Sequence, residues 1–96
     1  MSKPLSEEQI KSELESLEGW NVESDKLKKE FKFNNFKEAA SFIMRIAFEA
    51  EALQHHPELF NVYNKVEIGL TTHDAGDKIT QKDVELAKSI ETIYNK

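Results

Sequence analysis

The sequence predicts an α+β domain of two layers, a four-stranded antiparallel sheet with three helices packed on one face. Two observations predict this fold. Segments that open with helix-capping residues and segments that alternate polar and apolar residues follow one another as helix, hairpin, helix, two strands, helix. Such alternation is typical of antiparallel strands with one solvated face, which leaves the other face for helices. The length of 96 residues predicts a single domain over residues 1–96.

The first helix is predicted to begin after Ser6, because Ser6 and Gln9 have the spacing of a capping box. Gly19 supplies the left-handed residue that ends many helices. One apolar stripe along this segment consists of Ile10, Leu14 and Leu17.

A hairpin with one solvated face is predicted next. Trp20 and Val22 alternate with polar neighbours, and Ser24 with Asp25 predicts the turn. The apolar residues of the returning strand are Leu27, Phe31 and Phe33.

Asn35 is predicted to cap the second helix, with Glu38 at the reciprocal position. The helix should run to about Gln54, because Pro57 pushes His56 out of helical geometry. Its predicted core face consists of Phe36, Ala39, Ala40, Phe42, Ile43, Ile46, Ala47, Ala50 and Leu53.

Two further strands and a final helix complete the fold. A period-two register runs through Val62, Val66, Ile68, Leu70 and Thr72, with a tight connection at residues 63–65. Residues 74–77 are predicted to form a loop. Thr80 should cap the last helix, whose apolar face consists of Leu86, Ala87, Ile90, Ile93 and Tyr94.

Composition excludes several classes of function. Thirteen basic and eighteen acidic residues give a formal charge of −5, which disfavours binding to nucleic acid or to anionic membranes. The absence of cysteine excludes disulfides, thiolate chemistry and cysteine-ligated zinc. Because no apolar run resembles a signal peptide or a membrane span, we expect a cytoplasmic protein.

The most informative pattern is Glu51-x-x-x-His55-His56-Pro57, followed by the third histidine, His73. Histidine is the side chain that exchanges protons near neutral pH. Pro57 should make the two adjacent imidazoles diverge, and Glu51 at the helix end should favour a protonated His55, as a general acid requires. The alternative is that the motif only terminates a helix and that His73 is a structural loop residue.

Asp83 has two readings. It occupies the third position of the last helix, where a carboxylate commonly serves the cap. Its helical angle also falls within the apolar arc of Leu86, Ala87 and Ile90, so the carboxylate should face the protein body. An inward carboxylate could orient an imidazole.

Together, Glu51-x-x-x-His55-His56-Pro57, the run from Phe60 to Val66, Thr72-His73 and Asp83 resemble the signature of the pterin-4a-carbinolamine dehydratases. The resemblance is closest from about Phe42 to Asp83. Leu59 stands where many members carry tryptophan, and Asp74 where glutamate is frequent.

The resemblance implies a lyase that dehydrates 4a-hydroxytetrahydropterin to quinonoid dihydropterin, a step that recycles tetrahydrobiopterin for aromatic amino acid hydroxylases. It implies general acids in His55 and His73 and a positioning residue or base in His56, with Glu51 and Asp83 orienting the imidazoles. The implied substrate contacts are His55, His56, Pro57, Thr72, His73, Asp74 and Ala75. No metal or cofactor is implied, because the pterin is the substrate.

Met44 and Phe48 fall outside the predicted core arc. By the resemblance, this face is expected to join a homodimer or homotetramer. A second hypothesis is a binding module that uses this face as the dimerisation cofactor of a transcription factor. A metal site built from His55, His56 and His73 ranks last, because adjacent histidines before a proline diverge.

Overall fold

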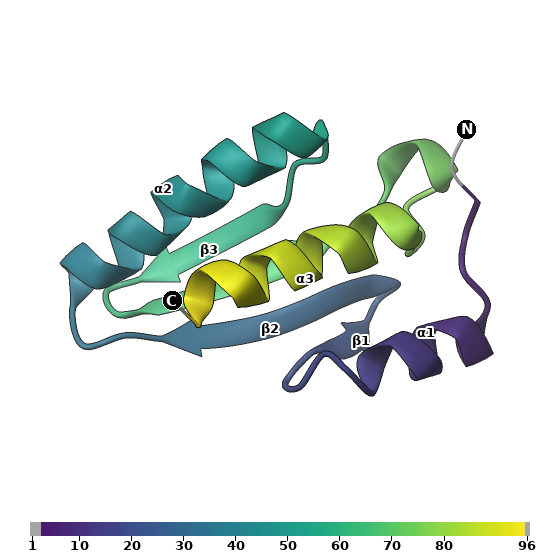
Figure 1. Cartoon of the computed structure of the whole chain (residues 1–96), viewed down its shortest axis with the longest axis horizontal. Helices are drawn as coiled ribbons and strands as arrows, with labels where there is room; N and C mark the ends of the chain where they lie inside the picture. Colours follow the sequence, from purple (N-terminus) through teal and green to yellow (C-terminus); the bar gives the residue numbers. More distant parts are fainter. Residues whose placement is uncertain (1–2, 96) are drawn as a thin grey trace.

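The computed structural model describes residues 3–95 and confirms the predicted two-layer α+β arrangement. The elements are α1 (Glu7–Leu14), β1 (Asn21–Glu23), β2 (Lys26–Lys32), α2 (Phe36–Leu53), β3 (Glu58–Val62), β4 (Lys65–Leu70), the short 3₁₀ helix η1 (His73–Ala75) and α3 (Gln81–Tyr94). All strand pairs are antiparallel, in the order β1-β2-β4-β3. Figure 1 shows α2 and α3 side by side across the sheet.

The core lies between the sheet and the helices. The two central strands contribute residues that are at most 1% exposed, among them Leu27, Phe31, Val66, Ile68 and Leu70. The helices meet them with Ala39, Phe42, Ile46, Ala50, Val84, Leu86, Ala87 and Ile90. Because α2 and α3 pack along these residues, the ends of the two helices are fixed relative to the sheet.

The first helix is shorter than predicted. It starts with the predicted capping box at Ser6 but ends at Leu14. Leu17 lies in the turns that follow and is buried in the core. Gly19 does take a left-handed backbone, with φ of 87°, but it turns the chain into Trp20 instead of ending the helix.

The predicted core face of α2 is too wide. Ala39, Phe42, Ile46 and Ala50 are buried at spacings of three and four residues, as expected for one helix stripe. Phe36, Ala47 and Leu53 were predicted to be core and are exposed instead. Hydrophobic periodicity identifies an apolar face, but it does not say how much of that face this chain itself covers.

The caps and turns follow local chemistry. Asn35 caps α2 by accepting from the Glu38 backbone N–H, whereas the Glu38 carboxylate accepts from the backbone of Asn34 and not of Asn35. Ser24 and Asp25 form the predicted turn with positive φ angles. Within the predicted loop, Gly76 and Asp77 are left-handed and a bridge pairs Thr72 with Lys78.

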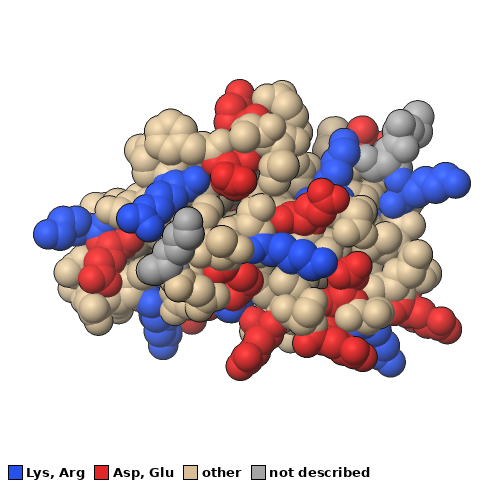
Figure 2. All heavy atoms as spheres, viewed as in Figure 1, with Lys and Arg blue, Asp and Glu red and all other residues tan. Residues whose placement is uncertain are grey.

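Charged side chains of both signs alternate over the surface seen in Figure 2. No broad basic field covers this face. Among residues 3–95, no helix has both the length and the apolar composition needed to cross a bilayer.

Candidate active site

The predicted site residues gather at one end of the sheet. The His55-His56-Pro57 segment joins α2 to β3, and Thr72 and His73 follow β4. The register pairs Glu58 with Gly69, so the start of β3 lies beside the end of β4. The N-terminus of α3 reaches the same place, because the hydroxyl oxygens of Thr72 and Thr80 lie 2.7 Å apart.

His55 turns into the protein because α2 ends abruptly. Gln54 is left-handed, with φ of 54° and ψ of 41°, and the His55 backbone N–H donates to the carbonyl of Ala50. The His55 residue is only 9% exposed, and its Nε2 lies 2.5 Å from Oδ1 of Asp83. The segment that reverses the chain therefore also aims the imidazole at α3.

The other ring nitrogen of His55, Nδ1, is not enclosed. No group of residues 3–95 forms a hydrogen bond with Nδ1, whereas every enclosed polar side-chain atom in this range has a partner. With Nε2 held by the carboxylate, Nδ1 is the atom that can exchange a proton with a bound molecule.

Asp83 is completely buried, and its two oxygens have separate partners. Oδ1 faces His55, while Oδ2 accepts from the Thr72 hydroxyl at 2.8 Å and from the Thr80 backbone N–H at 2.9 Å. A buried carboxylate needs such donors to offset its lost hydration. Asp83 thus contacts the helix cap and the histidine at the same time, so its geometry is compatible with both sequence readings.

Glu51 was predicted to act on His55, and that prediction is wrong. Its carboxylate contacts Nε2 of His56 at 2.8 Å. The helix ends before His55, so the spacing of four residues does not align Glu51 and His55 on one helical face. Hydrogen bonding to His56, followed by the charge of His56, lowers the pKa of Glu51 below its ordinary 4.5.

His73 stands on η1 with a side chain that is 96% exposed. Its Nδ1 lies 3.0 Å from a carboxylate oxygen of Asp77, which leaves Nε2 free to face a ligand. Asp74 is exposed and Ala75 half-buried on the same turn. Each of the three imidazoles therefore has one nitrogen held by a carboxylate of its own.

Sequence reasoning missed Asp77 and the Thr80 hydroxyl. The spacing of four residues between His73 and Asp77 was available as a signal, although it predicts contact only if the loop is helical. Thr80 was identified as a cap, but the contact of its hydroxyl with Thr72 depends on tertiary packing. Thr72 was expected to contact the substrate, and the structure shows that its side chain is buried.

The predicted interface residues and the alternative metal site remain to be located. Met44 and Phe48 lie on the outer face of α2, 59% and 71% exposed. No group of three or more potential metal-ligating side chains occurs within residues 3–95.

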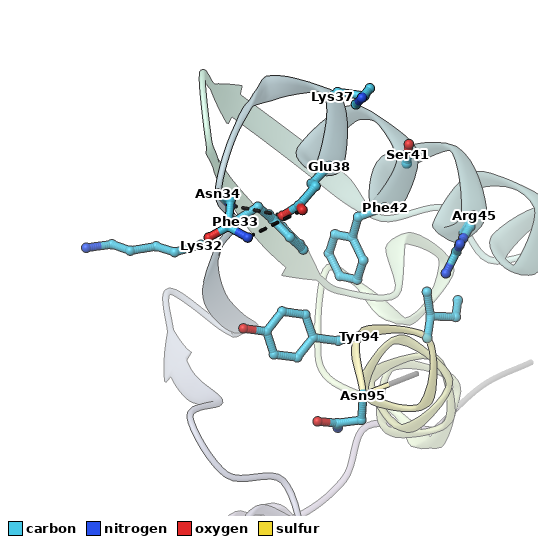
Figure 3. Close-up of a pocket in the computed structure, with 11 residues that line it drawn as sticks. Lys32, Phe33, Asn34, Lys37, Glu38, Ser41, Phe42, Arg45, Tyr94 and Asn95 are labelled. Carbon is cyan, nitrogen blue, oxygen red and sulfur yellow. Dashed lines mark hydrogen bonds between the residues drawn. The ribbon is translucent and has the colours of Figure 1, made fainter.

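A wide groove lies remote from the histidines. It encloses about 1020 Å³ between the first half of α2, the last residues of α3 and the end of β2. Figure 3 shows Phe42 and Tyr94 facing each other there, with Lys32, Lys37 and Arg45 around them. No histidine lines this groove, so it offers no group that titrates near neutral pH.

Comparison with known proteins adds a family. The sequence pattern of the family described as Pterin 4 alpha carbinolamine dehydratase matches residues 3–93. A protein of Opitutus terrae named as a candidate pterin-4-alpha-carbinolamine dehydratase is 54% identical over 89 residues, which are 93% of this chain and 92% of that protein. A protein of Christiangramia forsetii with the same name is 50% identical over 93 residues, 97% of this chain and 95% of its own.

A solved structure has the same fold. The crystal structure of a transcriptional coactivator/pterin dehydratase from Brucella melitensis superposes with a TM-score of 0.90. It is 34% identical in sequence, and the match covers 95% of this chain and 98% of that one.

Proposed function

The chain belongs to the pterin-4a-carbinolamine dehydratase family, and from that premise we propose that it dehydrates 4a-hydroxytetrahydropterin by histidine acid and base catalysis. The reaction breaks the bond between C4a and the hydroxyl oxygen, and N5 loses its proton. The products are quinonoid dihydropterin and water. Proton transfer at two positions is therefore the work required of the protein.

The buried pair of His55 and Asp83 is the observation that carries this proposal. A neighbouring carboxylate stabilises a positively charged imidazole, so the pair is suited to a general acid. Nε2 bonds the carboxylate and Nδ1 opens outward, so the proton for the departing hydroxyl leaves from Nδ1 of His55.

His73 and His56 take the remaining roles. For a 4a-hydroxyl that leaves from the opposite face of the pterin, His73 acts as the acid through Nε2, since Asp77 holds its Nδ1. His56, with Nε2 on Glu51, positions the ring and takes the N5 proton on Nδ1. A carboxylate that holds one N–H of a neutral imidazole leaves the other nitrogen as the base.

The polar edge of the pterin then lies along the turn that carries Thr72, His73, Asp74 and Ala75. The chemistry uses proton transfer alone, so the proposal assigns no metal or cofactor. We place the step in the recycling of tetrahydrobiopterin after an aromatic amino acid hydroxylase has formed the 4a-carbinolamine.

The test is the decay of chemically generated 4a-hydroxytetrahydropterin, followed by its ultraviolet absorbance, with catalytic amounts of the purified protein. Decay should be faster than the uncatalysed reaction and should scale with protein concentration. The matched control is His55→Ala at the same concentration. A wild-type protein that leaves the decay rate unchanged would refute the proposal.

We also propose that the outer face of α2 joins copies of this chain. Met44 and Phe48 are large apolar side chains exposed on one helix, and such patches commonly mark interfaces. Phe48→Glu should lower the mass measured by light scattering, whereas Thr92→Glu, at an exposed position of α3, should not. A wild-type monomer at micromolar concentration would contradict self-association.

The second candidate is a protein-binding module that uses the same face of α2. The Brucella melitensis neighbour is named as both a transcriptional coactivator and a pterin dehydratase. If Phe48→Glu leaves a wild-type oligomer intact while retaining dehydratase activity, the binding of another protein becomes the better account of this face than self-association.

A further inference from the structure

We propose that Thr72 is a positioning residue for the reaction, whose hydroxyl fixes Asp83 so that the carboxylate presents one oxygen to His55. This inference rests on the proposed function. It assigns to Thr72 a side-chain role distinct from the backbone contact with the pterin. The relevant groups are all enclosed, since Thr72, Thr80 and Asp83 are 2%, 1% and 0% exposed.

The direction of each hydrogen bond follows from the valences of the groups. The Thr80 hydroxyl oxygen accepts from the Lys82 backbone N–H, so its own hydrogen remains available to Thr72 at 2.7 Å. The Thr72 hydroxyl accepts that bond and donates its single hydrogen to Oδ2 of Asp83 at 2.8 Å. The chain therefore runs from Thr80 through Thr72 to Asp83 and ends at His55.

This series of hydrogen bonds determines which oxygen of Asp83 faces His55. Oδ2 receives two donors, from the Thr72 hydroxyl and the Thr80 backbone, whereas Oδ1 has His55 as its hydrogen-bond partner. A carboxylate anchored through one oxygen cannot rotate to offer both oxygens to the imidazole. The Thr72 donor thus keeps the geometry in which Nδ1 of His55 faces outward.

The backbone of Thr72 also stabilises the turn that carries His73, the second proposed acid. The Thr72 backbone N–H donates to the Lys78 carbonyl, and the Thr72 carbonyl accepts from the N–H groups of Ala75 and Asp77. These bonds close the turn that carries His73. One residue therefore ties the orientation of His55, through its side chain, to the placement of His73, through its backbone.

The test compares three substitutions. Thr72→Val keeps the shape of the side chain but removes the donor, Thr72→Ser keeps the hydroxyl, and Thr71→Val is the matched control. Thr71 is the neighbouring threonine, and its hydroxyl donates to the Asp25 carbonyl, away from Asp83. Thr72→Val should lower kcat by about tenfold or more with little change in KM, because a hydrogen bond to a charged group is lost.

Thr72→Ser should recover most of kcat, and Thr71→Val should match the wild type. An unchanged kcat in Thr72→Val, an equal loss in Thr71→Val, or a failure of Thr72→Ser to recover activity would each overturn the inference. A rise in KM with kcat preserved would also overturn it, because that result indicates substrate contact and not positioning.

Nuclear magnetic resonance of the ring nitrogens provides a readout that needs no substrate. In the wild type and in Thr71→Val, the Nε2 proton of His55 should show a defined resonance from its hydrogen bond to Asp83, whereas in Thr72→Val this resonance should shift and broaden. Identical ring-nitrogen spectra in the wild type and Thr72→Val would contradict the inference. Because this measurement is independent of turnover, it tests Thr72 even if the dehydratase assay fails.

The wild-type protein gives one more test, which holds if Thr72→Val does not fold. A hydroxyl that is buried and donated to a carboxylate exchanges slowly with water. The Thr72 hydroxyl proton should therefore be observable by nuclear magnetic resonance, unlike that of Thr71. A Thr72 hydroxyl that exchanges as fast as that of Thr71 would rule out the hydrogen-bonded chain.

Discussion

His55 and His56 are neighbours in the sequence, and each places Nε2 on a carboxylate, but the two pairs lie in opposite environments. The His55 and Asp83 side chains are 10% and 0% exposed, whereas those of His56 and Glu51 are 64% and 70% exposed. Asp83 is held by two further donors, and Glu51 lies at the exposed end of a helix. The same chemical pair therefore has a defined geometry in one place and is solvated in the other.

The difference teaches which pair can control a proton. In a buried site a hydrogen bond is electrostatically stronger and water does not compete for it. At the surface, an ion pair is screened by salt and contributes little. We therefore expect the buried pair to determine the acid function and the exposed pair to tune substrate placement.

The largest effect should come from removing both proposed acids. Since a positioned acid contributes about a hundredfold or more, the double variant His55→Ala and His73→Ala should lose more turnover than the roughly hundredfold expected of His55→Ala alone. The measurement is kcat in the dehydratase assay, with circular dichroism to confirm folding. A double variant no slower than His55→Ala alone would show that the two residues do not act separately.

Comparing His55→Ala with His56→Ala tests the contrast directly. His55→Ala should lower kcat by about a hundredfold or more. His56→Ala should cost less in kcat and should raise KM, because His56 also positions the ring. Both variants should remain folded. A folded His55→Ala variant with full activity, or an effect of His56→Ala that exceeds it, would overturn the assignment.

Replacing each carboxylate by its amide extends the comparison. Asp83→Asn keeps an oxygen for the donors of Thr72 and Thr80, so the amide nitrogen must face His55. Nε2 of His55 would then have to accept, which disfavours the doubly protonated imidazole that a general acid requires. Turnover should fall by about a hundredfold.

Glu51→Gln is the matched control for that substitution, since it makes the same change in the exposed pair. It should lower turnover by only about threefold.

Asp83→Asn should reduce the melting temperature by about 5 °C, because the cap bond survives in part. A similar loss of stability with unchanged turnover would mean that Asp83 serves the helix cap alone.

The sequence predicted the exposed pair poorly and the buried pair in part. The helical angle of Asp83 predicted an inward carboxylate, and the family resemblance linked it to the histidines. The bond from Asp83 to His55 spans 28 residues and depends on how α3 meets the end of α2. Glu51 was assigned to the wrong histidine because the left-handed Gln54 ends the helix before His55, and nothing local in the sequence predicted that conformation.

The fold was predicted more completely than the site, for a physical reason. Caps such as Ser6, Asn35 and Thr80 act within three residues, so their chemistry can be read locally. Phe36 and Leu53 are exposed because no other part of the described chain covers them, and the sequence pattern of one helix does not contain that information.

The smallest predicted effect belongs to the exposed pair and concerns acid pH. His56 lowers the pKa of Glu51 below 4.5, so the pair favours the folded state above about pH 4.5 and this contribution is lost as the pH falls through the lowered value. Because the Glu51 side chain is 70% exposed, the contribution is small and should weaken in high salt. In the variant His56→Gln, the pKa of Glu51 measured by carbon-13 resonance should rise toward 4.5, and the titration curve of the exposed Glu85 on α3 provides the control. If the Glu51 titration curve is the same in the wild type and in His56→Gln, then His56 is not the source of the shift and does not stabilise the Glu51 carboxylate.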